Sequence, residues 1–284
     1  MRIAILGATS QIAKDLILSF HVKNIHDLVL YARRPEVVSQ WLIKMGLSKR
    51  YIAADFSNFS TNEYFDTIFN FVGVGDPAQA IAIGYSIFDV TFKYDQMALD
   101  YVHKNPQCRY FFLSSGAAYG SNFDEPANKN TKSVIAINDL NYLDWYGIAK
   151  LHAECRHRAL AHLSIIDLRI FNYFSHTQDM SARFLIMDII RAIRKKIVLK
   201  TLPNYIVRDF LHPSDFYKLV EVLLSSPRTN LAVDCYSQAP IDKPRLLLAM
   251  QEEFGLQYEI TREVTSTNAT GSKSHYYSQN MCAS

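Results

Sequence analysis

The sequence predicts an α/β fold built on a doubly wound parallel sheet. Short runs rich in β-branched residues alternate with longer segments of helical periodicity through the first half of the chain. The first of these runs, residues 3–6, leads straight into a glycine and then into a helical pattern. Such alternation is typical of βαβ units, whose right-handed crossovers place helices on both faces of one parallel sheet.

Each expected strand or helix is predicted from the spacing of its apolar residues. Strands are predicted where short apolar runs stand between polar turns, and helices where apolar residues recur every three or four positions. The predicted strands are residues 3–6, 28–31, 51–53, 67–72, 110–113 and 164–168. The predicted helices of this half are residues 12–20, 89–102 and 146–162.

The pattern loosens after Ile170. A helix is expected at about residues 181–194, and a strand at residues 205–210. The Pro213-Ser214-Asp215 turn should cap a further helix at residues 216–224. The tail from residue 265 is rich in small polar residues and is expected to be mobile or partly extended.

Composition argues against several classes of function. The formal net charge is only +3, and the cluster from Arg191 to Lys196 is interpreted as one exposed helix end, so no nucleic-acid partner is expected. No apolar run approaches the roughly 18 residues that a membrane span needs, and no signal peptide precedes the first strand. The chain has four cysteines, Cys108, Cys155, Cys235 and Cys282. Their wide spacing argues against a metal site or a disulfide framework and favours a reducing, cytoplasmic compartment.

A glycine turn follows the first predicted strand and opens the first predicted helix, with the sequence Gly7-Ala8-Thr9-Ser10-Gln11-Ile12-Ala13. In a Rossmann-type fold, three small residues here permit the tight turn, the approach of the backbone to a pyrophosphate and the packing of helix on strand. Gly7 holds the first position, and Ser10 and Ala13 hold the other two. The helix N-terminus offers N–H groups to phosphates. We therefore predict that a dinucleotide contacts Gly7, Thr9, Ser10, Gln11 and Ile12. An ordinary strand-to-helix turn is the alternative.

The end of the second predicted strand bears on the choice between NAD and NADP. NAD sites place an acidic residue there to hold the ribose 2′-hydroxyl. This chain instead has Tyr31-Ala32-Arg33-Arg34, and guanidinium groups match a 2′-phosphate. Arg33 and Arg34 therefore favour NADP as the cofactor. A solvated loop without a ligand is the alternative.

A tyrosine and a lysine stand four residues apart in Tyr146-Gly147-Ile148-Ala149-Lys150. On a helix these two side chains share one face. A free tyrosine has a pKa near ~10, and a neighbouring ammonium favours its phenolate. Hydride transfer at an alcohol carbon needs such a group, because a proton must move on the oxygen. The motif comes after a strand that ends in Leu113-Ser114-Ser115.

Together these motifs resemble the extended short-chain dehydrogenase/reductases, and more narrowly the NAD(P)-dependent nucleotide-sugar epimerase/dehydratase/reductase family. The motifs are Gly7-Ala8-Thr9, Ser114-Ser115-Gly116-Ala117-Ala118-Tyr119-Gly120, Tyr146-Gly147-Ile148-Ala149-Lys150, Arg169-Ile170-Phe171-Asn172 and Arg208-Asp209-Phe210-Leu211-His212-Pro213-Ser214-Asp215. The resemblance runs from residue 2 to about residue 216. It implies a dinucleotide-binding domain over residues 1–171 and a smaller, mixed substrate-binding lobe over residues 172–284, partly interleaved with the first.

The resemblance implies catalytic roles for three residues. Ser115 would hydrogen-bond the reacting sugar oxygen, and Tyr146 would pass the proton. Lys150 would hold the nicotinamide ribose and tune Tyr146. The family often dimerises through the helix that carries the tyrosine, so a homodimer is also implied.

The resemblance implies binding roles for three more residues. Asp55, after the third predicted strand, would meet the adenine. Asn172 and Arg208 would face the diphosphate of a nucleotide-sugar substrate, and a guanidinium suits that task as a charge-assisted clamp. The alternative to a functional role for Asp55, Asn172 and Ser115 is a structural one, in which each side chain makes a capping or turn hydrogen bond. His212 is interpreted as a structural residue that packs a loop.

The residues just after Ser115 bear on the reaction. The 4,6-dehydratases of the family carry an acid pair there, and the reductases that also epimerise carry a cysteine at the position of Ala117. Gly116 and Ala117 cannot move a proton. The remaining Ser115, Tyr146 and Lys150 support hydride transfer at one carbon. We therefore expect NADPH-dependent reduction of a 4-keto-6-deoxy nucleotide sugar, in surface-polysaccharide sugar biosynthesis.

Two alternatives stay open. A nucleotide-sugar 4-epimerase with tightly bound NAD would use the same three residues, although Arg33 and Arg34 favour an exchangeable NADPH. A non-catalytic NADP-binding sensor would typically lack the tyrosine or the lysine, and this chain has both. A further hypothesis is that the tail from Ser272 to Ser278 closes over the substrate lobe.

Overall fold

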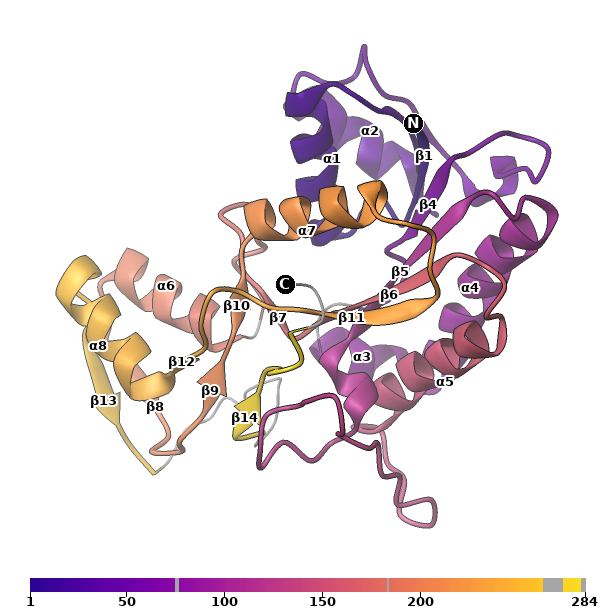
Figure 1. The fold of residues 1–284 in the computed structure, drawn as a ribbon. Helices are drawn as coiled ribbons and strands as arrows, with labels where there is room; N and C mark the ends of the chain where they lie inside the picture. The colour runs from indigo at the N-terminus through magenta and orange to yellow at the C-terminus, as the bar shows by residue number, and fades with distance from the viewer. Residues whose placement is uncertain (75–76, 183, 263–272, 282–284) are drawn as a thin grey trace.

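A seven-stranded parallel sheet forms the centre of the protein (Figure 1). The computed structural model describes residues 1–74, 77–182, 184–262 and 273–281. The sheet has the order β11-β6-β5-β4-β1-β2-β3. Its strands are β1 (Arg2–Leu6), β2 (Asp27–Tyr31), β3 (Ala53–Ala54), β4 (Thr67–Asn70), β5 (Arg109–Ser115), β6 (Ile165–Ile170) and β11 (Leu231–Cys235). The predicted Rossmann-type α/β fold is confirmed.

The register of the sheet brings the ends of its strands together. Leu6 of β1 lies opposite Tyr31 of β2 on one side and Asn70 of β4 on the other. Ser115, the last residue of β5, lies opposite Ile170 of β6. The strand order reverses between β1 and β4, and doubly wound sheets bind their ligands outside the carboxyl ends of the strands at this point.

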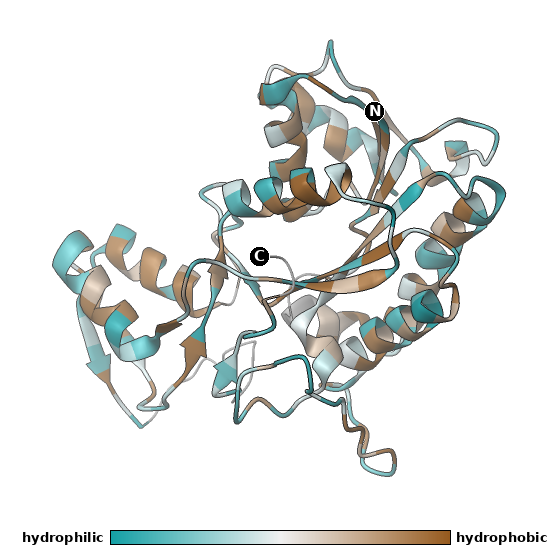
Figure 2. Cartoon of the chain, in the orientation of Figure 1, coloured by the Kyte–Doolittle hydropathy of each residue, from teal (hydrophilic) through white to brown (hydrophobic). Residues whose placement is uncertain are grey.

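Helices cover both faces of the sheet (Figures 1 and 2). One face carries α1 (Gln11–Lys23), α2 (Pro35–Lys44) and α7 (Pro213–Ser225). The other carries α4 (Ser86–Lys104) and α5 (Trp145–Ala159). Phe20, Leu42 and Phe216 belong to the apolar cluster of the first face, and Leu99 and Ala153 to that of the second. Burial of these apolar faces stabilises the three layers.

A smaller lobe lies beside the sheet. In it α6 (Leu185–Lys195) and α8 (Lys243–Phe254) share an apolar cluster that contains Ile189 and Leu247. Three small sheets complete this region: β7 (Asn172–Tyr173) with β10 (Phe210–Leu211), β8 (Leu199–Thr201) with β13 (Tyr258–Ile260), and β9 (Val207–Arg208) with β12 (Ile241–Asp242) and β14 (His275–Tyr276). The short elements α3 (Pro77–Ile83), η1 (Phe56–Asn58) and η2 (Gly116–Tyr119) join the larger ones.

Several predicted boundaries are wrong. The strand expected at residues 51–53 is reduced to Ala53–Ala54, and the strand expected at 205–210 is divided into β9 and β10 at Asp209. The Asp209 carboxylate accepts a hydrogen bond from the Ser237 backbone at 3.1 Å, so this residue leaves the pairing pattern. The cap of α7 is His212, whose ring accepts a hydrogen bond from the Ser214 N–H at 3.2 Å. His212 therefore has a structural role, but as an exposed helix cap and not as the residue that packs a loop.

The larger elements that were not predicted are α2, α8 and the sheet strand β11. In β11 the fully buried Asp234 interrupts the apolar run, so local hydropathy gives a weak signal there. Among the described helices, none is long and apolar enough to cross a membrane. The tail hypothesis concerns Ser272, which lies outside the described residues, and Lys273 to Ser278, which lie within them.

Candidate active site

The turn after β1 can be made only by glycine. Gly7 has φ +82°, and a Cβ built there would lie 2.8 Å from the backbone of Phe71 and of Val72. The N–H groups of Gly7 and Ala8 both donate to the Tyr31 carbonyl, at 2.9 and 3.0 Å. Positive φ and close backbone approach both exclude a side chain. The turn therefore fixes the start of α1 at the carboxyl end of β1.

The N-terminus of α1 is tied to a distant part of the chain. Ser10 occupies the cap position, and its side chain makes no capping hydrogen bond. The Gln11 side chain donates to the Asp15 carboxylate at 3.2 Å and to the Thr177 hydroxyl. Asp15 also accepts from the hydroxyls of Thr177 at 2.6 Å and Tyr173 at 2.9 Å. These contacts connect α1 with residues 173–177 and were not predicted. Thr9, Ser10, Gln11 and Ile12 are each part-buried at this helix start.

The residues predicted to bind the cofactor's ribose 2′-phosphate and its adenine follow two adjacent strands. Arg33 and Arg34 come directly after β2 and are exposed. Asp55 follows β3, which pairs with β2 through Tyr31 and Ala54. The Asp55 carboxylate caps η1 by accepting from the Ser57 N–H at 2.9 Å, and this hydrogen bond lowers its pKa. The structure thus places two guanidinium groups and one carboxylate at neighbouring strand ends.

The structure brings Ser115, Tyr146 and Lys150 together. Ser115 ends β5, Tyr146 lies in the first turn of α5, and the Ser115 hydroxyl is near enough to the Tyr146 phenol to lower the pKa of that phenol. The Lys150 ammonium lies 5.9 Å from the centre of the Tyr146 ring. Helix α5 approaches η2 so closely that a Cβ on Gly147 would lie 2.7 Å from the Ala117 carbonyl oxygen. A glycine next to Tyr146 is therefore what lets the phenol reach Ser115.

In this structure Lys150 does not contribute to the pKa of Tyr146. Burial raises this pKa, and the nearby Ser115 hydroxyl opposes the rise only in part. The Lys150 ammonium is directed elsewhere, because it donates to the Leu113 carbonyl at 2.6 Å and lies 4.4 Å from the Phe112 ring centre. In this structure Tyr146 is therefore a phenol at neutral pH, a form that can donate a proton.

Lys150 is almost completely buried, with 4 % of its surface exposed. Burial lowers its pKa to about 8, although the carboxylates of Asp95, Glu154 and Asp167 favour the charged form. The Lys150 ammonium consequently loses its proton at a pH only slightly above neutral.

A buried ionic network lies behind Lys150 and was not predicted. Glu154 accepts from the Ser114 hydroxyl at 2.5 Å and from the Arg169 guanidinium at 3.0 Å. His157 contacts Asp95 with one ring nitrogen at 2.7 Å and Asp167 with the other at 2.6 Å. Burial opposes the charged ring, but these two carboxylates raise the pKa of His157 to about 9. The spacing of Lys150, Glu154 and His157 along one helix face is the signal that could have revealed it.

The two residues predicted to bind the substrate diphosphate, Asn172 and Arg208, donate hydrogen bonds to backbone oxygens of the protein itself. Asn172 donates its side-chain amide to the backbone oxygens of Asp209 at 3.2 Å and Tyr276 at 3.3 Å. Arg208 is 5 % exposed and donates to the backbone oxygens of Val207 and Lys273, both at 2.8 Å. Burial lowers the pKa of Arg208 to about 10. Both side chains thus contact the C-terminal segment.

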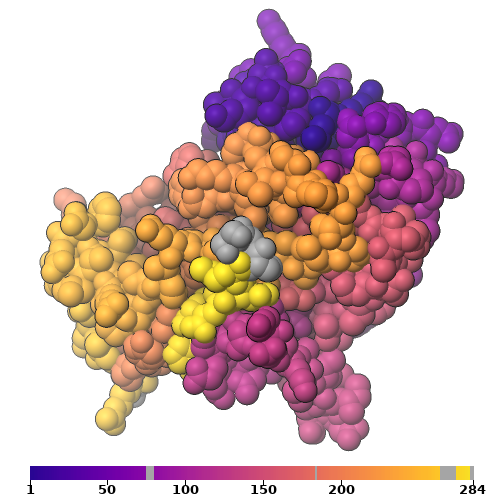
Figure 3. Space-filling model, in the orientation of Figure 1, coloured from indigo at the N-terminus to yellow at the C-terminus, as the bar shows by residue number. Residues whose placement is uncertain are grey.

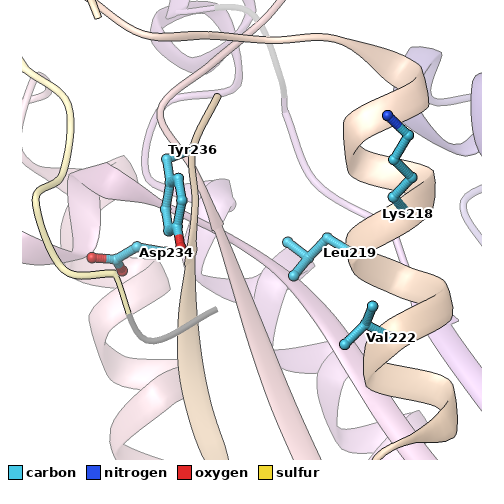
Figure 4. Close-up of a pocket in the computed structure, with 5 residues that line it drawn as sticks. All are labelled: Lys218, Leu219, Val222, Asp234 and Tyr236. Carbon is cyan, nitrogen blue, oxygen red and sulfur yellow. The ribbon is translucent and has the colours of Figure 1, made fainter. Parts of the chain in front are cut away.

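A small cavity of about 220 Å³ lies between α7 and β11 (Figure 4). It is lined by Lys218, Leu219, Val222, Asp234 and Tyr236. The Asp234 carboxylate points away from α7 in this view and accepts hydrogen bonds from the hydroxyls of Tyr119 at 2.8 Å and Ser278 at 2.6 Å. The lining includes none of Ser115, Tyr146 and Lys150, so the cavity is separate from the catalytic group.

A Rossmann-type sheet, a glycine turn at α1 and a serine–tyrosine–lysine group beside β5 define an oxidoreductase of the extended short-chain dehydrogenase/reductase type. The model of the NAD dependent epimerase/dehydratase family matches residues 3–236 of the chain. The chain belongs to this family. None of the curated proteins is similar enough to the chain in sequence to count as a match.

Solved structures of nucleotide-sugar enzymes share the fold at low sequence identity. The dTDP-glucose 4,6-dehydratase of Bacillus anthracis, in complex with NAD, is 15 % identical with a TM-score of 0.77, covering 100 % of this chain and 89 % of that one. The UDP-glucose 4-epimerase of Bifidobacterium longum, in complex with NAD⁺ and UDP, is 16 % identical with a TM-score of 0.75, covering 100 % and 91 %. The UDP-N-acetylglucosamine 4-epimerase of Methanobrevibacter ruminantium is 14 % identical with a TM-score of 0.79, covering 98 % and 89 %.

Proposed function

We propose that this protein reduces a 4-keto-6-deoxy nucleotide sugar to the 6-deoxy nucleotide sugar with NADPH, in surface-polysaccharide sugar biosynthesis. The observation that carries the proposal is that the two positions directly after Ser115, Gly116 and Ala117, have no side chain that can transfer a proton. A Cβ on Gly116 would lie 2.4 Å from the Phe171 ring. An acid at position 116 would displace Phe171, so dehydration lacks its acid pair there.

The residues present fit a single reduction step. Bound NADPH would supply a hydride to the ketone carbon. Ser115 would hydrogen-bond the ketone oxygen, and Tyr146 would donate its proton to that oxygen as it becomes an alcohol. The raised pKa of Tyr146 favours this direction, because the phenol is present at neutral pH. Lys150 would hold the nicotinamide ribose with its ammonium.

The choice of NADP rests on the end of β2. Arg33 and Arg34 are exposed there, and the residues between Tyr31 and Pro35 include no acid. Guanidinium groups bind a 2′-phosphate, whereas an NAD site uses a carboxylate. An epimerase with tightly bound NAD is the competing function, and several structural neighbours are 4-epimerases.

We also propose that the enzyme works in the cytoplasm as a homodimer through the α4–α5 face. On that face Phe92 of α4 is 47 % exposed and stacks on His152 of α5, with ring centres 6.4 Å apart. An exposed aromatic pair on two neighbouring helices suits a helix-to-helix contact. Sedimentation of the protein and of its Phe92→Asp variant tests this point.

Calorimetric titration of the purified protein with NADPH and with NADH tests the proposed function, after its absorbance has been checked for bound cofactor. We expect an empty protein that prefers NADPH and then turns over a 4-keto-6-deoxy nucleotide sugar. Copurifying NAD, with interconversion of two sugar epimers, would overturn the reductase in favour of the epimerase. Tight NADPH binding without turnover of any nucleotide sugar would favour a non-catalytic sensor.

A further inference from the structure

The C-terminal residues 273–278, here called the strap, include β14, which lies beside β9 (Figure 1), and bring Tyr276 to Ser115. Its β14 pairs with β9, and its backbone accepts from Val207 N–H at 2.7 Å and donates to the Phe123 carbonyl at 2.8 Å. Ser278 anchors its end by donating to the buried Asp234 at 2.6 Å. Figure 3 shows this yellow segment lying against the magenta part of the chain, consistent with the bridge between Ala127 and Ser278. The strap is therefore a fixed part of the site.

The strap contacts each of the three residues that were predicted to bind substrate. The Tyr276 carbonyl accepts from Asn172 at 3.3 Å, and the Lys273 carbonyl accepts from Arg208 at 2.8 Å. The Tyr276 hydroxyl lies 3.2 Å from the Ser115 hydroxyl. One short segment thus connects the catalytic serine with both predicted diphosphate residues.

The Tyr276 side chain is held tightly. It is 5 % exposed, and its ring centre lies 4.8 Å from that of Phe123 and 5.3 Å from that of Phe171. Burial raises its pKa, so its oxygen carries a proton at neutral pH. Packing on two aromatic rings leaves the hydroxyl directed at Ser115 in a single orientation.

The hydrogen bonds of Ser115 can be counted. A serine hydroxyl has one proton to donate and two lone pairs to accept with. The Ala117 N–H donates to it at 3.2 Å, and a proton from Tyr276 would fill the second lone pair. The Ser115 proton is then directed to the remaining partner, the Tyr146 oxygen or the oxygen of a bound ketone.

We propose that Tyr276 is a positioning residue that donates its hydroxyl proton to Ser115 and so directs the Ser115 proton to the reacting oxygen. Tyr276 acts through Ser115 and exchanges no proton with the substrate. This inference rests on the proposed reduction of a nucleotide sugar, and it assigns to the strap a part in the chemical step.

Kinetics of Tyr276→Phe, Ser115→Ala and the double variant test the proposal. Phenylalanine keeps the ring in its aromatic cluster and removes only the hydroxyl. We expect Tyr276→Phe to lower kcat about tenfold, from the loss of one buried hydrogen bond, while the KM for the nucleotide sugar stays within about twofold. In the Ser115→Ala background the same change should have no further effect on kcat, since the pair acts as a unit.

Tyr277→Phe is the matched control. It removes a hydroxyl from the next residue of the strap, whose phenol has a pKa influenced by Gln279 and not by Ser115. We expect its kcat to equal that of the wild type. NADPH affinity, measured by calorimetry, shows that each variant is folded.

Three results would overturn the role of Tyr276 while the reductase stands. These are wild-type kcat in Tyr276→Phe, a rise in KM with kcat unchanged, and a further full loss of kcat in the Ser115→Ala background. A wild-type protein that reduces no nucleotide sugar would instead contradict the proposed function, so the two failures are distinguishable.

Discussion

The cofactor end and the substrate end of this protein are built in opposite ways. At the cofactor end, the predicted residues from Gly7 to Arg34 belong to one βαβ unit, and the two arginines are exposed. At the substrate end, Ser115, Asn172 and Arg208 come from separate elements and all contact the strap. This part of the predicted cofactor site is local, and its two arginines are exposed, whereas the predicted substrate site is assembled from distant segments and covered by the strap.

This difference indicates which parts of the chain set the specificity for the cofactor and for the substrate. We expect the choice of cofactor to depend on side chains at the end of one strand, so that a local substitution can change it. We expect substrate recognition to depend instead on how the strap holds Ser115, Asn172 and Arg208 in place. The predictions below test the two ends separately.

The largest effect is expected at the catalytic group. Tyr146→Phe removes the proton donor and should lower turnover by at least ~10²-fold. NADPH binding should remain nearly intact, because the ring still packs in the first turn of α5. Steady-state kinetics together with calorimetry measure both quantities. Near-wild-type activity would exclude Tyr146 as the acid.

Gly7→Ala tests the turn at the cofactor end. The added Cβ would meet the backbone of Phe71 and Val72 at 2.8 Å in a left-handed conformation, and we expect a loss of about 3 kcal/mol in the free energy of unfolding. Gly46→Ala is the matched control, since Gly46 has φ +73° with nothing within 4 Å of the added Cβ. It should lose only about 1 kcal/mol. Equal losses in chemical denaturation would mean that the close approach at Gly7 is unimportant.

Cofactor choice is tested by replacing Arg33 and Arg34 together with alanine. The affinity for NADPH should fall about tenfold or more, because charge-assisted hydrogen bonds to the 2′-phosphate are lost, while that for NADH stays unchanged. Replacing the exposed Arg194 and Lys195 of α6 removes the same charge far from β2 and serves as the control. An equal loss for both cofactors would contradict the 2′-phosphate assignment.

The smallest effect is a pH dependence. The pKa of Lys150 is lowered to about 8, so the ammonium that we propose holds the ribose loses its proton as pH rises through that value. Tyr146 stays protonated over the same range, because its pKa is raised. The kcat/KM of the wild type should therefore fall several-fold between about pH 7 and 9. Lys150→Arg, whose guanidinium keeps its proton, should show a flat profile over this range even if its rate is lower.

The sequence predicted correctly those features that depend on residues close together in the chain. Hydropathy periods located six of the seven sheet strands, and the spacing of Tyr146 and Lys150 placed both on one helix. The strand β11 was missed because Asp234 interrupts it, and that carboxylate is explained only by its distant partners Tyr119 and Ser278. The ion pairs of His157 were also missed, since the spacing on α5 gives only one side of the contact and its partners Asp95 and Asp167 lie on α4 and β6.

The sequence by itself determined the α/β fold, the family and the helix face that Tyr146 and Lys150 share. These follow from short-range rules: the period of a strand or helix, the conformational freedom of glycine at one turn, and the four-residue spacing on a helix. The tertiary structure decided the rest. It raised the pKa of Tyr146 by burial, turned the Lys150 ammonium to Leu113, and brought Tyr276 to Ser115 across 161 positions of sequence. Burial and long-range contacts exist only once the chain has packed, so no local segment contains them.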